Sequence, residues 1–128
     1  MSDCEGALHP RARDGITLFN QGRYFEAHEA LEIAWRDEAG KIRQLYQGIL
    51  EAGVAHLHIR RQNLAGALKV HSRSMRWLRE WPEVCRGAHI GQLRRDMEAI
   101  ISEANRLGPN RLAEIDAAFF RPIILNEG

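Results

Sequence analysis

The sequence lacks the features that mark membrane, secreted and disulfide-rich proteins. None of its apolar runs approaches the roughly 20 residues that a membrane-spanning helix needs. Its first residues contain no hydrophobic core of a secretory signal peptide. The two cysteines, Cys4 and Cys85, are too few and too far apart along the chain to indicate a disulfide framework or a thiolate metal site. We therefore expect a soluble, cytoplasmic protein with reduced thiols and no membrane partner.

Specific catalytic motifs are also missing. There is no glycine-rich phosphate loop. The segment from His28 to Glu32 reads His-Glu-Ala-Leu-Glu, so it lacks the second histidine of the His-Glu-x-x-His zinc motif. No histidine is positioned by the sequence to activate Cys85. The sequence therefore nominates no catalytic residue and leans away from an enzyme.

What the chain does contain is helical periodicity almost throughout, with no alternating strand pattern. Its 128 residues, 45% hydrophobic and 27% charged, fit one globular domain over residues 1–128. We predict an all-α, compact bundle of about five main helices joined as helix–turn–helix hairpins, with the helix at about 41–61 at its centre. The expected helices cover about 10–20, 24–38, 41–61, 63–80 and 89–107, before a short helix at 110–118. An apolar tail at 119–125 should pack against the bundle or a partner subunit.

One local pattern occurs twice. The turn at Gly22 and the turn at Gln62, 40 residues later, each precede a large side chain by two residues and an alanine by five. This spacing resembles tetratricopeptide-type repeats. Two copies are too few to stack into a solenoid, so we interpret them as shared hairpin geometry.

Polar side chains on two of the expected helices are the candidate site. On a helical wheel His28 falls in the middle of the apolar arc of helix 24–38, which predicts a core position. Glu32 lies beside it at the edge of the arc, and Glu29 lies on the border. Helix 41–61 is apolar over most of its circumference. Its polar stripe is either a solvent window or a buried strip and consists of Gln47, Glu51 and His58, whereas His56 lies among apolar neighbours.

These residues allow more than one interpretation. If the two helices face each other, His28, Glu32, Gln47, Glu51 and His58 can form a buried structural network, which is the leading interpretation. The same helices could instead bring two histidines and two carboxylates together around a divalent metal, in a hydrolase-like site. That metal set would be His28, Glu32, Glu51 and His58, and no cofactor is assured. Metal-free acid–base chemistry is a further alternative.

A second candidate surface is basic. Residues 59–79 carry six cations and no acid. Such a block can bind phosphate or nucleic acid, although a solvated helix face is the more ordinary explanation. We do not expect a nucleic-acid partner from this pattern, because the nearby tryptophans lack the interleaving of a single-strand binder. The face consists of Arg60, Arg61, Lys69, Arg73 and Arg76, with Arg79 beyond them.

The segment from Phe19 to Trp35 resembles the signature of the bacterial and archaeal family called domain of unknown function 309. The block Gln47-Gly48-Ile49 and the block from His58 to Ala67 are similar to later parts of that signature, so the resemblance covers about residues 12–80. The resemblance implies an all-helical bundle and no established activity. Glu51 stands where relatives commonly place glutamine, and Gln62 replaces a common glycine. The family's polar signature falls on His28, Glu29, Glu32, Gln47, His58 and Asn63.

The leading hypothesis is therefore a small non-enzymatic domain whose polar network fixes helix packing. Its surface would serve an unidentified protein partner or a second copy of the chain. The metal-dependent site and the basic face are the alternatives.

Overall fold

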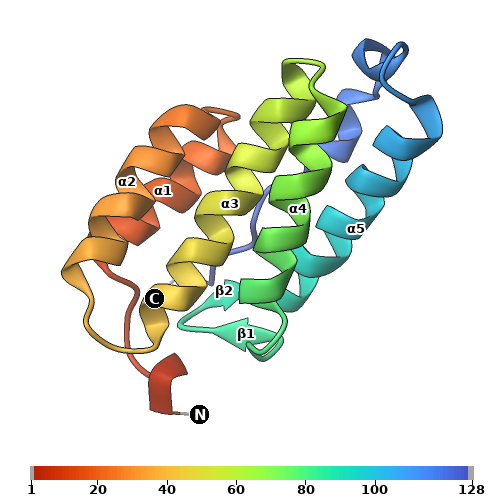
Figure 1. Cartoon of the computed structure of the whole chain (residues 1–128). Coiled ribbons are helices and arrows are strands. Elements are labelled where there is room, and N and C mark those ends of the chain that lie inside the picture. Colours follow the sequence, from red (N-terminus) through yellow and green to blue (C-terminus); the bar gives the residue numbers. More distant parts are fainter. Residues whose placement is uncertain (1, 127–128) are drawn as a thin grey trace.

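A computed structural model describes residues 2–126, and Figure 1 shows their arrangement. These residues form five α-helices, which confirms the all-α prediction, and α3 lies between α2 and α4 as the expected central helix. None of the helices in this range is long and apolar enough to cross a membrane. The helices are α1 Pro10–Asn20, α2 Tyr24–Asp37, α3 Ile42–Arg60, α4 Leu64–Leu78 and α5 Ile90–Leu107.

The two hairpins α1–α2 and α3–α4 are closed by the same turn. Gly22 and Gln62, the two positions 40 residues apart, both adopt a left-handed backbone, with φ of 76° and 60°. The residue after each of them returns its N–H to a carbonyl near the end of the preceding helix, which is the Schellman arrangement. These bonds are Arg23 N to Leu18 O at 2.9 Å and Asn63 N to His58 O at 2.9 Å. The shared hairpin geometry expected from the sequence is therefore present in the structure.

The α3–α4 contact is close because Gly48 has no side chain. A Cβ at this position would lie 2.6 Å from Leu78 Cδ2. Ser74, which is fully buried on α4, donates its hydroxyl to the Gly48 carbonyl oxygen at 2.8 Å. Glycine thus lets α4 approach α3 closely enough for a side chain of one helix to bond the backbone of the other.

An aromatic cluster fills the core where α1, α2 and α3 meet the C-terminal segment. His56 is 2% exposed, as its apolar neighbours on the wheel predicted. Its ring lies 5.2 Å from those of Phe19 and Tyr24 and 5.5 Å from that of Phe120. Burial lowers the pKa of His56 to about 4, so the ring is neutral at pH 7.

The structure contains a small hairpin that the sequence did not predict. Strand β1, Val84–Cys85, pairs antiparallel with β2, Ala88–His89. The connecting residues Arg86 and Gly87 both have positive φ, which is the backbone of a tight two-residue β-turn. Strands of two residues are too short to produce a detectable alternation.

The expectation of reduced thiols is wrong in this structure. Cys4 and Cys85 form a disulfide, with their Cα atoms 4.6 Å apart. Distance along the chain does not limit distance in space, because the N-terminal segment returns to the β-hairpin. Arg86 fixes it there: its backbone N–H bonds the Cys4 carbonyl oxygen at 3.1 Å and its Nε bonds the Asp3 carbonyl oxygen at 2.7 Å.

The C-terminal part confirms one prediction and corrects another. Residues 110–118 do not form a short α-helix; the 3₁₀ turns Leu112–Glu114 and Ala117–Phe119 stand there instead. Asp116 interrupts the segment, since its backbone is extended and its side chain accepts a bond from Ala118 N. The apolar tail packs on the bundle as expected. Ile123 is buried, and its backbone N–H and C=O both bond the side chain of Asn20 on α1.

Candidate interaction groove

His28 does not point into the core, contrary to the wheel-based prediction. Its side chain is 35% exposed and that of Glu32 45%, while Glu29 is exposed. Apolar character does not mark the buried face of this helix, because Phe25 on α2 is 54% exposed. The buried face of α2 centres roughly 100° from His28 and consists of Tyr24, Ala27, Ala30, Leu31 and Ala34. His28 Nε2 lies 3.8 Å from Glu32 Oε2, which is an ion pair only when the imidazole is protonated.

Glu51 faces α4 and is separated from His28. The Glu51 side chain is buried, and its Oε1 lies 3.3 Å from Arg73 Nε. Burial raises the pKa of Glu51, opposed by the Arg73 guanidinium and by the neighbouring Gln47 side chain. The stripe of polar residues on α3 is therefore in part a strip against α4.

The four predicted metal ligands are not assembled. Glu51 and His58 are seven residues apart on one helix, which places them about 10 Å apart along its axis. Across residues 2–126, no group of three or more His, Cys, Asp or Glu side chains is arranged to hold a metal ion. The predicted network likewise divides into a half-exposed pair on α2, His28 and Glu32, and the neighbouring Gln47 and Glu51 on α3, of which only Glu51 is buried.

Two of the predicted histidines do come together, in a groove between α2 and α3. His28 and His58 line a cavity of about 220 Å³ with Phe25, Val54, Leu57 and Arg61. Its lining contains three apolar side chains, two imidazoles and one guanidinium, and no carboxylate. We call this the α2–α3 groove.

Asn63 determines which nitrogen of His58 carries the proton. Asn63 caps α4, because its Oδ1 accepts the backbone N–H of Gly66 at 3.0 Å. Its Nδ2 is therefore the atom that faces His58 Nδ1, at 3.2 Å, and Nδ2 can only donate. Nδ1 accepts this bond, so the neutral ring carries its proton on Nε2. His58 thus presents an N–H donor rather than a metal-binding lone pair.

The predicted basic face is not a single free surface. Arg60 donates from Nη1 to the Gly22 carbonyl oxygen at 2.6 Å, and its guanidinium lies 4.7 Å from the Tyr24 ring centroid. Arg73 pairs with Glu51. Arg61 lines the α2–α3 groove, and Lys69 and Arg76 are exposed on α4. Two of the five cations therefore stabilise the fold.

The chain is similar to known proteins over part of its length. Residues 12–70 match the family model described as Domain of unknown function (DUF309). The predicted family resemblance is confirmed over these residues. The chain is also 40% identical over 74 residues to an uncharacterised protein, YpuF, of Bacillus subtilis (strain 168). That alignment covers 56% of this chain and 42% of YpuF, so the chain spans less than half the length of this relative.

Sequence reasoning did not assign four of the six lining residues to a groove: Phe25, Val54, Leu57 and Arg61. A usable signal was present for Phe25. It follows Tyr24 directly, and neighbouring residues on a helix point about 100° apart, so a narrow buried face cannot include both. Arg61 follows the last residue of α3, where a wheel has no fixed direction to assign.

Proposed function

We propose that the DUF309 segment is a protein-interaction module and that its α2–α3 groove holds a partner segment with an apolar side chain beside a carboxylate. The observation that carries this proposal is the lining of the groove. Exposed apolar surface and hydrogen-bond donors meet there with no acid among them. The module needs no chemistry of its own.

The apolar anchor is supported by Phe25. It is the most exposed of the large hydrophobic side chains in the described residues, and its ring lies 6.2 Å from that of His28. Val54 and Leu57 on α3 extend the apolar lining. Complete burial of a phenylalanine side chain contributes about 1.5–3 kcal/mol, so a partner side chain that covers Phe25 gains from the hydrophobic effect.

The carboxylate is supported at the end of the groove formed by His58 and Arg61. The Nε2–H of His58 and the Arg61 guanidinium are donors, and a hydrogen bond to a charged group contributes about 1.5–3 kcal/mol. At the other end, Glu32 lies near His28 and would repel an acid. The acidic group of the partner therefore belongs at the His58–Arg61 end.

The earlier alternatives stay predictions of the sequence. A metal site would have to use His28 and His58 without Glu51, and the tautomer of His58 opposes coordination through Nε2. On the basic face, the exposed side chains of Lys69 and Arg76 could still bind phosphate. The cytoplasmic location also stays a prediction, and a disulfide is uncommon in that compartment.

Selection from a displayed random peptide library tests the proposal. Peptides selected on the wild-type chain should share an apolar residue next to Asp or Glu. Their affinity should fall at least tenfold with Arg61→Glu and with Phe25→Ser. Arg76→Glu, which makes the same charge change on α4 outside the groove, should leave it unchanged. Phe25 is exposed, so its loss should barely change the melting temperature.

Two results would count against the interaction module. One is a set of peptides that bind Phe25→Ser as tightly as the wild type. The other is a thermal shift with Zn²⁺ that both His28→Ala and His58→Ala abolish, because that would favour the metal site instead.

A further inference from the structure

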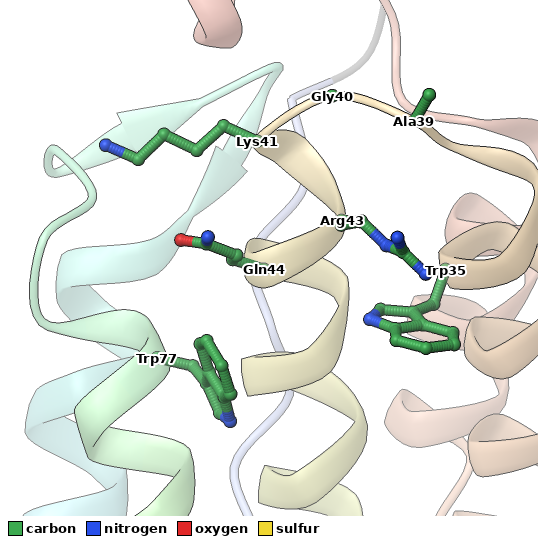
Figure 2. A pocket seen from close by; sticks show the side chains of 7 residues that line it. All are labelled: Trp35, Ala39, Gly40, Lys41, Arg43, Gln44 and Trp77. Atoms are coloured by element: carbon green, nitrogen blue, oxygen red, sulfur yellow. The ribbon is translucent and has the colours of Figure 1, made fainter.

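A second hollow lies at the other end of α3, away from the α2–α3 groove. Its volume is about 390 Å³, within the range of small-molecule sites. It is formed by the end of α2, the connection to α3, the first turn of α3 and one residue of α4. Figure 2 shows the two tryptophans on either side of the start of α3, with Gln44 on the side of Trp77. Its lining residues are Trp35, Ala39, Gly40, Lys41, Arg43, Gln44 and Trp77.

The two tryptophans differ in what they offer a ligand. The Arg43 guanidinium lies 4.0 Å from the centre of the Trp35 ring, so one face of that indole is already covered. Stacking also fixes the position of the guanidinium. Trp77 is 37% exposed, which is unusual for the largest apolar side chain. Trp77 therefore has free aromatic surface, and Trp35 serves as the support for a cation.

The charged side chains that line the hollow are all positive. Lys41 and Arg43 line it, and no carboxylate does. Lys41 Nζ lies 3.8 Å from Glu80 Oε2, a pair at the exposed rim that contributes little. Arg43 Nε is a buried donor without a hydrogen-bond partner among residues 2–126. Unlike Lys41, Arg43 has no ion-pair partner within these residues. Figure 2 shows Lys41 and Arg43 pointing to opposite sides of α3, so an anion in the hollow would pair with Arg43.

Gln44 adds a side-chain amide that can form hydrogen bonds with the edge of a planar ligand. Its side chain projects between Lys41 and Trp77 in Figure 2, on the same side of α3 as both. An amide offers one acceptor and two donor hydrogens, which matches the edge of a nucleobase. Such a base would lie flat on Trp77, since aromatic stacking accepts any base.

We propose that this hollow binds a nucleoside phosphate. The base stacks on Trp77, Gln44 bonds its edge, and the phosphate pairs with the Arg43 guanidinium. The proposal uses a different end of the molecule from the α2–α3 groove and does not depend on the interaction module. A free mononucleotide and the end of a single strand share this chemistry, so both are measured.

Calorimetric titration of the full chain with AMP, adenosine, inorganic phosphate and a five-nucleotide single strand tests the site. AMP should bind, with adenosine and phosphate each at least tenfold weaker, because each lacks half of the contacts. A strand that binds at least tenfold more tightly than AMP would identify the strand as the source of the same chemistry. Phosphate that binds as tightly as AMP, or no binding of AMP at millimolar concentration, would overturn the proposal.

Variants separate the site from general charge. Arg43→Gln and Trp77→Ala should each weaken AMP binding at least tenfold, and Trp77→Phe should restore part of the loss. Lys69→Gln removes one exposed cation of α4 outside the hollow and should change nothing. Trp77 also packs near Gly48, so circular dichroism at 20 °C checks that its variants fold. If Trp77→Ala is unfolded, Arg43→Gln and Gln44→Ala decide the outcome, and unchanged AMP affinity in both would reject the site.

Discussion

The two hairpins of this chain reach the same turn with different residues. In α1–α2 the left-handed position is Gly22, and a Cβ there would lie 2.8 Å from Arg60 Nη2. In α3–α4 the same position is Gln62, which is exposed and has a φ of 60°. The hydrogen bonds to the preceding helix are the same in both. The comparison shows that the same hydrogen bonds close the turn with or without a glycine, and that the two positions differ in the Arg60 side chain that lies beside Gly22.

In both hairpins a glycine of the first helix lets a leucine of the second helix pack closely, but the two glycines lie at different distances from the turn. Gly15 on α1 faces Leu31 of α2, and Gly48 on α3 faces Leu78 of α4, with Cβ positions that would lie 2.5 Å and 2.6 Å from the leucine side chains. Gly15 lies seven residues before its turn, whereas Gly48 lies fourteen residues before its own. The close contact between the two helices thus lies farther from the turn in the second hairpin than in the first.

The largest expected effect concerns His56, which joins the hairpins by packing against Phe19 and Tyr24. Its folded pKa of about 4 lies below the ordinary 6.5, chiefly because of burial. Below pH 6.5 the unfolded chain binds a proton that the folded chain does not. Stability is therefore complete above pH 6.5 and falls by about 3 kcal/mol by pH 4. Urea unfolding at pH 7 and pH 4 measures the change.

The variant His56→Phe should lose this share of the acid sensitivity, while His28→Gln, at a half-exposed position, should retain it. Equal acid losses in His56→Phe and in the wild type would refute the assignment to His56.

The next effect tests the close approaches. Gly48→Ala should lower the free energy of unfolding by about 1–3 kcal/mol, since overpacking must displace Leu78 and Trp77. Gly15→Ala should cost less, because only Leu31 has to move. Gly40→Ala is the control, with nothing within 4 Å of its Cβ. Thermal unfolding of the three variants gives the order, and a Gly15→Ala loss that exceeds the Gly48→Ala loss would reverse the comparison.

The smallest effect exchanges the turn residues. Gln62→Gly should stabilise the chain by about 0.5 kcal/mol. A left-handed backbone costs a non-glycine residue about 1–2 kcal/mol, and glycine avoids this cost. Glycine also loses more backbone entropy on folding, which offsets part of the gain. Gly22→Ala should destabilise, through the backbone and through contact with Arg60. Chemical denaturation resolves both signs. A loss of stability in Gln62→Gly would show that the glutamine side chain contributes something the turn geometry does not require.

Much of the fold could be predicted because it depends on local patterns. The helix positions, the Asn63 cap, the burial of His56 and the packed tail follow from periodicity, capping preference and hydrophobicity. The 3₁₀ turns after α5 and the two-residue strands do not, since such short elements leave no period to detect.

The candidate site was less predictable because it depends on which part of an apolar arc is buried. A wheel gives directions and not neighbours, so it placed His28 in the core and missed the exposure of Phe25. The pairing of His28 with His58 followed from the facing helices. The separation of Glu51 from His58 could have been predicted, because residues seven apart on one helix lie about 10 Å apart along its axis.

Cys4 precedes α1 and Cys85 follows α4, so the disulfide closes the first four helices into a covalent ring. A protease that cuts one peptide bond between residues 5 and 84 would open this ring without releasing a fragment. The two hairpins would stay attached to each other and to α5 until the disulfide is also reduced. A single cut therefore releases neither hairpin while the disulfide is intact.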